Sequence, residues 1–213
     1  KKKIFDSRFV TSMNIAKWNK KMDKPPKLVI STSATGIYNN IHYHDEYSTD
    51  FADNFLGKVC KAWEKPFIKL DNDKTRVVIA RLGVVIGYGG IFKKMLPLFK
   101  MGLGAKIGHG RYPMPFIHID DLLKFYGMTL KNENIKGTYN IVAPDIITNA
   151  EFTNAMAKVV NKKAFFRIPP FILDLLFGKG LMRIINNPIV IPKRLLEIDF
   201  KYEKDQIVDA LIA

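Results

Sequence analysis

The stretch Lys27-Leu28-Val29-Ile30-Ser31-Thr32 decides the fold, because it is a short apolar run of the kind that forms a strand buried on both faces. A second run of this kind is Thr75-Arg76-Val77-Val78-Ile79-Ala80, and a helical pattern over about residues 50–69 lies between the two. Parallel strands need a crossover connection, usually a helix, that returns the chain to the same end of the sheet. The segment 27–80 therefore predicts a βαβ unit.

The alternation of strands and helices continues on both sides of this unit. Upstream, apolar residues from Phe5 to Ala16 recur at helical spacing, and Pro25-Pro26 stops that helix. Downstream, Thr148-Asn149-Ala150-Glu151 predicts a capping box at the start of a helix. Other patterns predict helices over about 91–101 and 120–131, glycine-rich loops over 87–90 and 102–110, and a strand over 138–142. Strands separated by helices predict an α/β fold with a doubly wound, mostly parallel sheet covered on both faces.

The predicted sheet is short, with only about three strands where a doubly wound sheet usually has about six. The chain also begins inside a helical pattern. We therefore expect residues 1–164 to be the C-terminal part of a larger sheet domain. From Phe165 onward, short amphipathic segments are broken by prolines and glycines, which predicts a small, mostly helical C-terminal cap over 165–213.

Composition narrows the classes of partner. No run of about 18 apolar residues is present, so we expect no membrane-spanning helix, and the single cysteine is typical of a reducing compartment, by default the cytoplasm. The net charge of +14 raises the question of nucleic acid. However, 27 of the 34 basic residues are lysines, and they are scattered along the chain instead of clustered on one element. We therefore expect no nucleic-acid partner, and a homodimer stays open.

Three motifs in chain order resemble the extended short-chain dehydrogenases/reductases. Ile30-Ser31-Thr32-Ser33-Ala34-Thr35-Gly36-Ile37-Tyr38 resembles the family's strand and loop that carry a substrate-polarising serine. Arg81-Leu82-Gly83-Val84-Val85-Ile86-Gly87 resembles the next strand and its cofactor-facing loop, and Phe116-Ile117-His118-Ile119-Asp120-Asp121-Leu122 is similar to a downstream signature. The resemblance implies an NAD(P)-binding, Rossmann-like fold and a small-molecule substrate.

Further features are similar to one atypical branch, the NAD-dependent epimerase family that is also labelled SulA-like. They are Asp6-Ser7-Arg8, Trp63-Glu64, Gly90 with Lys94-Met95-Leu96, and Val142-Ala143-Pro144 with Thr148-Asn149-Ala150-Glu151-Phe152. The cap is similar to the C-terminal domain of unknown function in that branch. The resemblance implies that the glycine-rich cofactor loop lies upstream of residue 1, and that NADP, slightly favoured, or NAD is the cofactor. The candidate cofactor-binding residues are Arg8, Ser31, Thr32, Arg81, Gly83, Val84 and Val85.

The resemblance also shows a departure that puts ordinary carbonyl–alcohol redox chemistry in doubt. The superfamily uses a tyrosine as general acid/base and a lysine four residues later, one helical turn apart. Aligned on Trp63-Glu64, the two places hold Leu56 and Cys60, neither of which can take the role. Tyr38 is a candidate surrogate acid, although a packing tyrosine is the stronger interpretation. We therefore expect an oxidoreductase or epimerase with Ser33 and Tyr38 as catalytic candidates, or a non-catalytic dinucleotide-binding sensor or scaffold.

Each remaining candidate has a plain structural alternative. Ser33 could orient a substrate oxygen or bond only to the turn that ends its strand. Arg81 could meet a cofactor phosphate or acidic substrate, or pair with a buried carboxylate, which is slightly favoured. Lys94 and His118 are placed on the substrate side, while an aspartate at 120 or 121 is expected to cap the next helix.

Two further alternatives concern metal and nucleophile chemistry. His42-Tyr43-His44-Asp45-Glu46 lacks a second ligand cluster, so we expect no metal, and Cys60 is interpreted as a small buried hydrophobe.

Overall fold

The structure is a computed structural model that describes residues 2–87, 89–169 and 187–212, without the side chains of 90–92 and 94. Its elements in chain order are α1 (Lys2–Lys21), β1 (Leu28–Ala34), the 3-10 helix η1 (Thr35–Ile37), β2 (Tyr43–His44), α2 (Phe55–Ile68), β3 (Arg76–Leu82), β4 (Val84–Ile86), α3 (Gly90–Lys100), β5 (Ala105–Ile107), β6 (Phe116–His118), α4 (Ile119–Lys131), β7 (Gly137–Ile141), α5 (Asn149–Val159), β8 (Phe166–Ile168), β9 (Ile189–Val190), α8 (Lys193–Glu197) and α9 (Ile207–Ile212).

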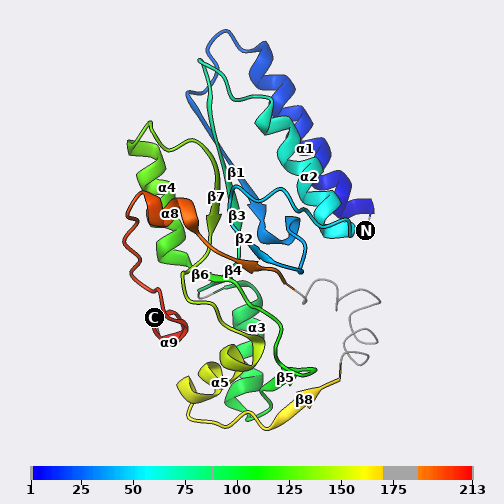
Figure 1. The fold of residues 1–213 in the computed structure, drawn as a ribbon, viewed down its shortest axis with the longest axis vertical. Coiled ribbons are helices and arrows are strands. Elements are labelled where there is room, and N and C mark those ends of the chain that lie inside the picture. The colour runs from blue at the N-terminus through cyan, green and yellow to red at the C-terminus, as the bar shows by residue number, and fades with distance from the viewer. Residues whose placement is uncertain (1, 88, 170–186, 213) are drawn as a thin grey trace.

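A three-stranded parallel sheet in the order β1-β3-β7 forms the centre of one half of the molecule. Figure 1 shows α1 and α2 side by side on one face of this sheet and α4 with α8 on the other. Covering on both faces explains why the middle strand is buried without alternation, from Val77 to Arg81. The βαβ unit and the doubly wound α/β fold are confirmed.

The crossover helix α2 begins at Phe55, five residues later than the sequence pattern indicates. The Asn54 side chain accepts a hydrogen bond from the Gly57 amide at 3.0 Å and so caps the helix. Gly57 lies so close to Ala52 that a Cβ there would overlap the Ala52 carbonyl oxygen. The chain before Asn54 therefore forms a tight turn that packs against Gly57, and this turn is the reason why α2 begins at Phe55 and not near residue 50.

The second half of the molecule contains α3, α5 and two short parallel strand pairs, β4 with β6 and β5 with β8 (Figure 1). Gly83 separates β3 from β4, and a Cβ there would lie 2.6 Å from the Pro115 carbonyl oxygen, so glycine permits this close passage. The predicted capping box is confirmed, since the Glu151 amide donates to Thr148 Oγ1 and the Thr148 amide donates to Glu151 Oε2. The predicted loop over 102–110 is wrong in part, because it contains β5, whose partner β8 lies far along the chain.

Three carboxylates accept hydrogen bonds from backbone amides of the C-terminal segment 187–212 and so hold it against the rest of the chain. Asp121, which is fully buried, accepts hydrogen bonds from the Glu203 and Lys204 amides at 2.8 and 3.1 Å. Glu46 accepts from the Arg194 amide, and Asp145 accepts from the Ile207 amide. The expected domain boundary between 164 and 165 stays a prediction, because residues 170–186 lie outside the described residues.

The start of α4 corrects one expectation. An aspartate was expected to cap this helix, but the N-cap is His118, whose Nδ1 accepts from the Asp120 amide at 3.3 Å. Asp121 is unavailable for capping because its two oxygens serve the C-terminal segment. None of the helices among the described residues is both long enough and apolar enough to cross a membrane.

Candidate functional site

Ser33 lies near the carboxyl end of β1, opposite Arg81 of β3, at the edge where parallel α/β sheets bind ligands. Its side chain is buried, and within the described residues its Oγ makes no hydrogen bond of acceptable geometry. The Ser33 hydroxyl nevertheless lies close enough to the Cys60 thiol to lower the pKa of that thiol. Ser33 thus has a buried hydroxyl at the ligand-binding edge, with the Cys60 thiol as its neighbour.

Cys60 and Leu56 of α2 occupy the places that the resemblance gives to the lysine and the tyrosine. Burial is the largest influence on Cys60 and, with the charge of Glu64, raises the pKa of the thiol to about 11. The Leu56 side chain faces Gly36, at 3.6 Å from the position that a Cβ there would take. The α2 wall beside Ser33 therefore presents a neutral thiol and an alkyl group, which supply neither a proton donor of suitable pKa nor a fixed positive charge.

Arg81 is at the centre of a buried network that leaves it little freedom to meet a ligand. Its Nε donates to Glu64 Oε1 at 3.0 Å and its Nη2 donates to Glu64 Oε2 at 2.7 Å. Although burial by itself lowers the pKa of Arg81, the hydrogen bonds and the charge of Glu64 raise it overall. Arg81 could have met a cofactor phosphate, an acidic substrate or a buried carboxylate, and the structure pairs it with the buried carboxylate of Glu64.

Tyr38 belongs to the same network. Its hydroxyl accepts a hydrogen bond from Arg81 Nη1 at 2.7 Å and donates to Asn140 Oδ1 at 2.9 Å. Burial raises the pKa of Tyr38, and only 2% of the residue is exposed. His44 stacks on the Tyr38 ring, with centroids 5.0 Å apart and an interplanar angle of 13°. This placement gives Tyr38 a packing role, and the surrogate-acid role stays a prediction.

The other cofactor candidates divide between the sheet and the outer surface. Ser31 is buried in β1, and Thr32 Oγ1 is hydrogen-bonded to the Tyr126 hydroxyl at 2.8 Å. Val84 and Val85 lie in β4, which is separated from the end of β3 at Leu82 by the single residue Gly83. Arg8 is exposed on α1, where its guanidinium lies 5.5 Å from the centroid of the Trp63 ring of α2. The structure therefore places Ser31 and Thr32 beside Ser33 on β1, Val84 and Val85 on the separate strand β4, and Arg8 on the α1–α2 surface.

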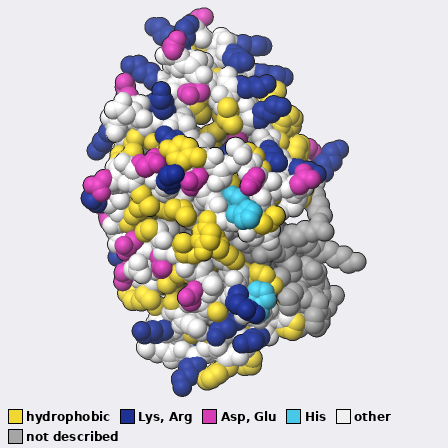
Figure 2. Space-filling view, in the orientation of Figure 1, with side chains coloured by type: hydrophobic (Ala, Val, Ile, Leu, Met, Phe, Trp, Pro, Cys, Tyr) yellow, Lys and Arg dark blue, Asp and Glu magenta, His cyan; other side chains and the backbone are white. Residues whose placement is uncertain are grey.

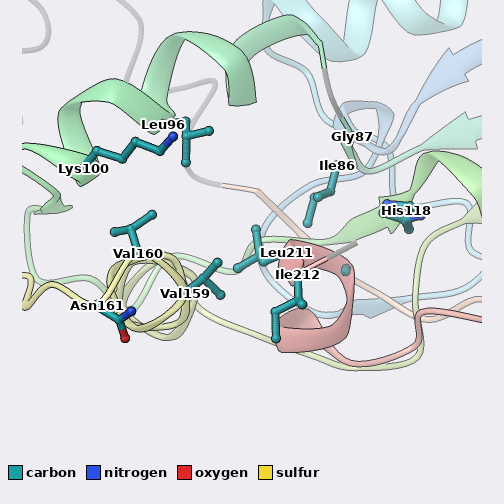
Figure 3. Close-up of a pocket in the computed structure, with 11 residues that line it drawn as sticks. Ile86, Gly87, Leu96, Lys100, His118, Val159, Val160, Asn161, Leu211 and Ile212 are labelled. Atoms are coloured by element: carbon teal, nitrogen blue, oxygen red, sulfur yellow. The ribbon is translucent and has the colours of Figure 1, made fainter.

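On the substrate side, His118 lies at the end of β6 and is one wall of a cavity of about 400 Å³ (Figure 3). The Lys94 side chain lies outside the described residues. Sequence reasoning missed this cavity, because its walls come from α3, α5 and α9 as well as from β4 and β6. It also missed Asn140, whose backbone amide donates to Glu46 Oε1 at 2.9 Å. Glu46 was considered only within the stretch 42–46 as a possible metal ligand, and its pairing with Asn140 has no local sequence signal.

A parallel sheet in the order β1-β3-β7 with helices on both faces defines the chain as a Rossmann-like α/β protein. No protein-family model matches the chain. It is 32% identical to human epimerase family protein SDR39U1 over 214 residues, which cover 99% of this chain and 73% of that protein. A chloroplastic SDR39U1 homologue from Arabidopsis thaliana is 31% identical, and this chain covers 62% of the length of that protein. The chain belongs to the SDR39U1 epimerase family, an atypical branch of the short-chain dehydrogenases/reductases, as the resemblance predicted.

Solved structures agree with this assignment. The crystal structure of human SDR39U1 (isoform 2) with NADPH matches with a TM-score of 0.92, covering 98% of this chain and 72% of that one. A nucleoside-diphosphate sugar epimerase from Corynebacterium glutamicum matches with a TM-score of 0.77 at 25% identity, covering 99% of this chain and 42% of that one. The predicted Rossmann-like fold is therefore confirmed.

Proposed function

We propose that this protein binds NADP(H) and is an oxidoreductase or epimerase-type enzyme that acts on a small molecule. The observation that carries the proposal is the buried Ser33 hydroxyl at the carboxyl edge of the sheet, beside the Cys60 thiol. The similarity to human SDR39U1, whose structure was solved with NADPH, supports the choice of cofactor. A bound nicotinamide would accept or supply a hydride.

The strand-end residues fit such a group. Ser31 and Thr32 precede Ser33 on β1, while Val84 and Val85 continue the chain beyond the neighbouring strand β3. Both segments are expected to line the cofactor through their backbone, because their side chains pack into the sheet or bond elsewhere. Ser33 would then donate its hydroxyl proton in a hydrogen bond to a carbonyl or hydroxyl oxygen of the substrate.

The alternative is a dinucleotide-binding protein without catalysis, a sensor or scaffold. Leu56 and Cys60 favour it, because neither can act as the acid or as the cation of the usual pair. Tyr38 favours it as well, since Arg81 and Asn140 already occupy its hydroxyl. The two proposals share the cofactor and differ in turnover.

A turnover assay separates them. The protein, expressed from its complete coding sequence, is mixed with NADPH and a panel of carbonyl compounds and sugar nucleotides, and the absorbance of the reduced nicotinamide is followed. Ser33→Ala is expected to lower turnover by roughly 10²-fold. The matched control is Ser12→Ala, which removes a buried hydroxyl that donates to the Arg8 carbonyl on α1. NADPH binding without turnover of any substrate favours the sensor.

We also propose a cytoplasmic location and no nucleic-acid partner. The single cysteine supports a reducing compartment. In Figure 2, lysine and arginine side chains are spread over the visible face with acidic side chains between them. Such a mixed surface supports a small-molecule partner over a polyanion, and retention on DNA at physiological salt would contradict it.

A further inference from the structure

The open-sided cavity beside β4 is lined by parts of the chain that are far apart in sequence. Ile86 and Gly87 form the wall nearest the sheet, α3 contributes Leu96, the end of α5 contributes Val160, and α9 contributes Leu211. In Figure 3 these side chains converge from α3, from the turn after α5 and from α9. Its volume of about 400 Å³ lies in the range of small-molecule sites, which are mostly apolar with a few polar groups.

The cavity has an apolar middle and polar groups at its ends. Lys100 lies along α3 with its amino end beside Leu96, and His118 lies at the opposite end beyond Ile86 (Figure 3). His118 Nδ1 accepts a hydrogen bond from the Asp120 amide, so this ring nitrogen is already engaged. Among the lining residues that the structure describes, Lys100 is the one with a permanent positive charge.

The turn at the end of α5, which also lines the cavity, satisfies its own backbone groups. Asn161 has a left-handed backbone, with φ of 54°, and the Lys162 amide donates to the Ala157 carbonyl at 2.8 Å. This pattern closes the helix and satisfies its last carbonyl groups. Lys100, which is exposed to solvent, is therefore the cationic lining residue that can pair with an anion.

We infer that the cavity binds a small organic monoanion, with an acyl or aryl body against Ile86, Leu96, Val160 and Leu211 and a carboxylate at Lys100. A nucleoside diphosphate fits less well, because its two phosphates need several cationic or amide partners and the described lining offers one lysine. Ile86 and Gly87 directly follow Val84 and Val85, so a molecule bound here lies next to the proposed cofactor. The identification of this anion as the substrate rests on the proposed function, whereas its binding does not.

Methyl NMR with octanoate as the probe tests the site without any dinucleotide. The methyl signals of Ile86, Val160 and Leu211 are expected to shift on titration, while that of Ile15, exposed on α1, stays in place. Octanoate is expected to bind more tightly than 1-octanol, and octylamine more weakly than either. Equal binding of octanoate and octylamine, or shifts no larger than at Ile15, would overturn the inference.

Two matched pairs of variants localise the effect. Lys100→Glu is expected to weaken octanoate binding by about fivefold, while Lys158→Glu, the same charge change at an exposed site on α5, has little effect. Leu96→Trp fills the cavity and is expected to abolish binding, whereas Leu98→Trp, on the exposed side of α3, preserves it. Thermal melting of each variant verifies its fold. Equal weakening within either pair contradicts the site.

A separate NADPH titration distinguishes the two proposals. Octanoate binding without NADPH binding removes the proposed function and leaves the cavity site intact. NADPH binding without octanoate binding overturns the cavity site and leaves the proposed function intact. Binding of both, with octanoate tightened in the presence of NADPH, places the anion in the active site.

Discussion

Arg81 and Glu64 form a two-point ion pair in the interior, with Nη2 and Oε2 at 2.7 Å and side chains that are 5% and 2% exposed. The pair joins β3, which carries Arg81, to α2, which carries Glu64. Arg81 Nη1 also donates a hydrogen bond to the hydroxyl of Tyr38, the residue that follows η1. The pair therefore fixes α2 against the sheet at the edge where Ser33 lies.

Removing one partner of this pair is expected to be costly. Glu64→Ala leaves the guanidinium of Arg81 buried without its counter-charge, so the free energy of unfolding should fall by about 3–5 kcal/mol. Urea denaturation measures the change. The control is Lys58→Ala, which breaks an exposed 3.5 Å pair with Asp53 and should cost less than about 1 kcal/mol. Similar losses in the two variants would contradict the role of the buried pair.

Tyr38→Phe tests the packing interpretation of this tyrosine. It removes a hydroxyl that both accepts from Arg81 and donates to Asn140, so the free energy of unfolding should fall by about 1–3 kcal/mol. A packing tyrosine leaves the pH profile of any turnover in its original position. Loss of turnover with unchanged stability would instead make Tyr38 the proton donor.

Cys60 should make stability depend on pH in the alkaline range. Its pKa is raised from 9.0 to about 11 by burial, so the unfolded chain loses the thiol proton first. The stabilisation is present below about pH 9 and is lost as the pH rises through 11, with a total of about 2–3 kcal/mol. Denaturation curves of the protein and of Cys60→Ala at several pH values measure the difference. A difference that does not change between pH 8 and 11 would contradict the raised pKa.

Asp121 and Asp120 form a natural matched pair for the C-terminal anchor. Asp121→Ala removes the acceptor of two backbone amides at a fully buried site, so a loss of about 2–4 kcal/mol is expected, with faster hydrogen exchange at Glu203 and Lys204. Asp120 is half-exposed and its replacement should cost less than about 1 kcal/mol. Unchanged exchange at both amides in Asp121→Ala would show that the anchor lies elsewhere.

The sequence predicted the layers of this fold well, because buried parallel strands and amphipathic helices have strong local patterns. The run 27–32, the strand after Thr75 and the capping box at Thr148 all have such a signal. Contacts that join distant segments have none. The pairing of β5 with β8 and the use of Asp121 as an anchor depend on tertiary structure alone.

The same distinction applies to the site. Ser33 could be located from the end of its strand and from the resemblance, and the absence of a tyrosine–lysine pair could be read directly at Leu56 and Cys60. The partner of Arg81 stayed open, because a guanidinium at a strand end suits a phosphate as well as a carboxylate. The cavity stayed hidden, since α9 is a short segment with no motif.

The measurement that tests the central claim most directly is a fluorescence titration of NADPH and NADH against the protein expressed from its complete coding sequence. Dinucleotide binding at the Ser33 edge predicts saturable binding of NADPH with a dissociation constant between about 1 μM and 1 mM, and weaker binding of NADH. Absence of saturable binding of either dinucleotide by the folded protein would contradict the account.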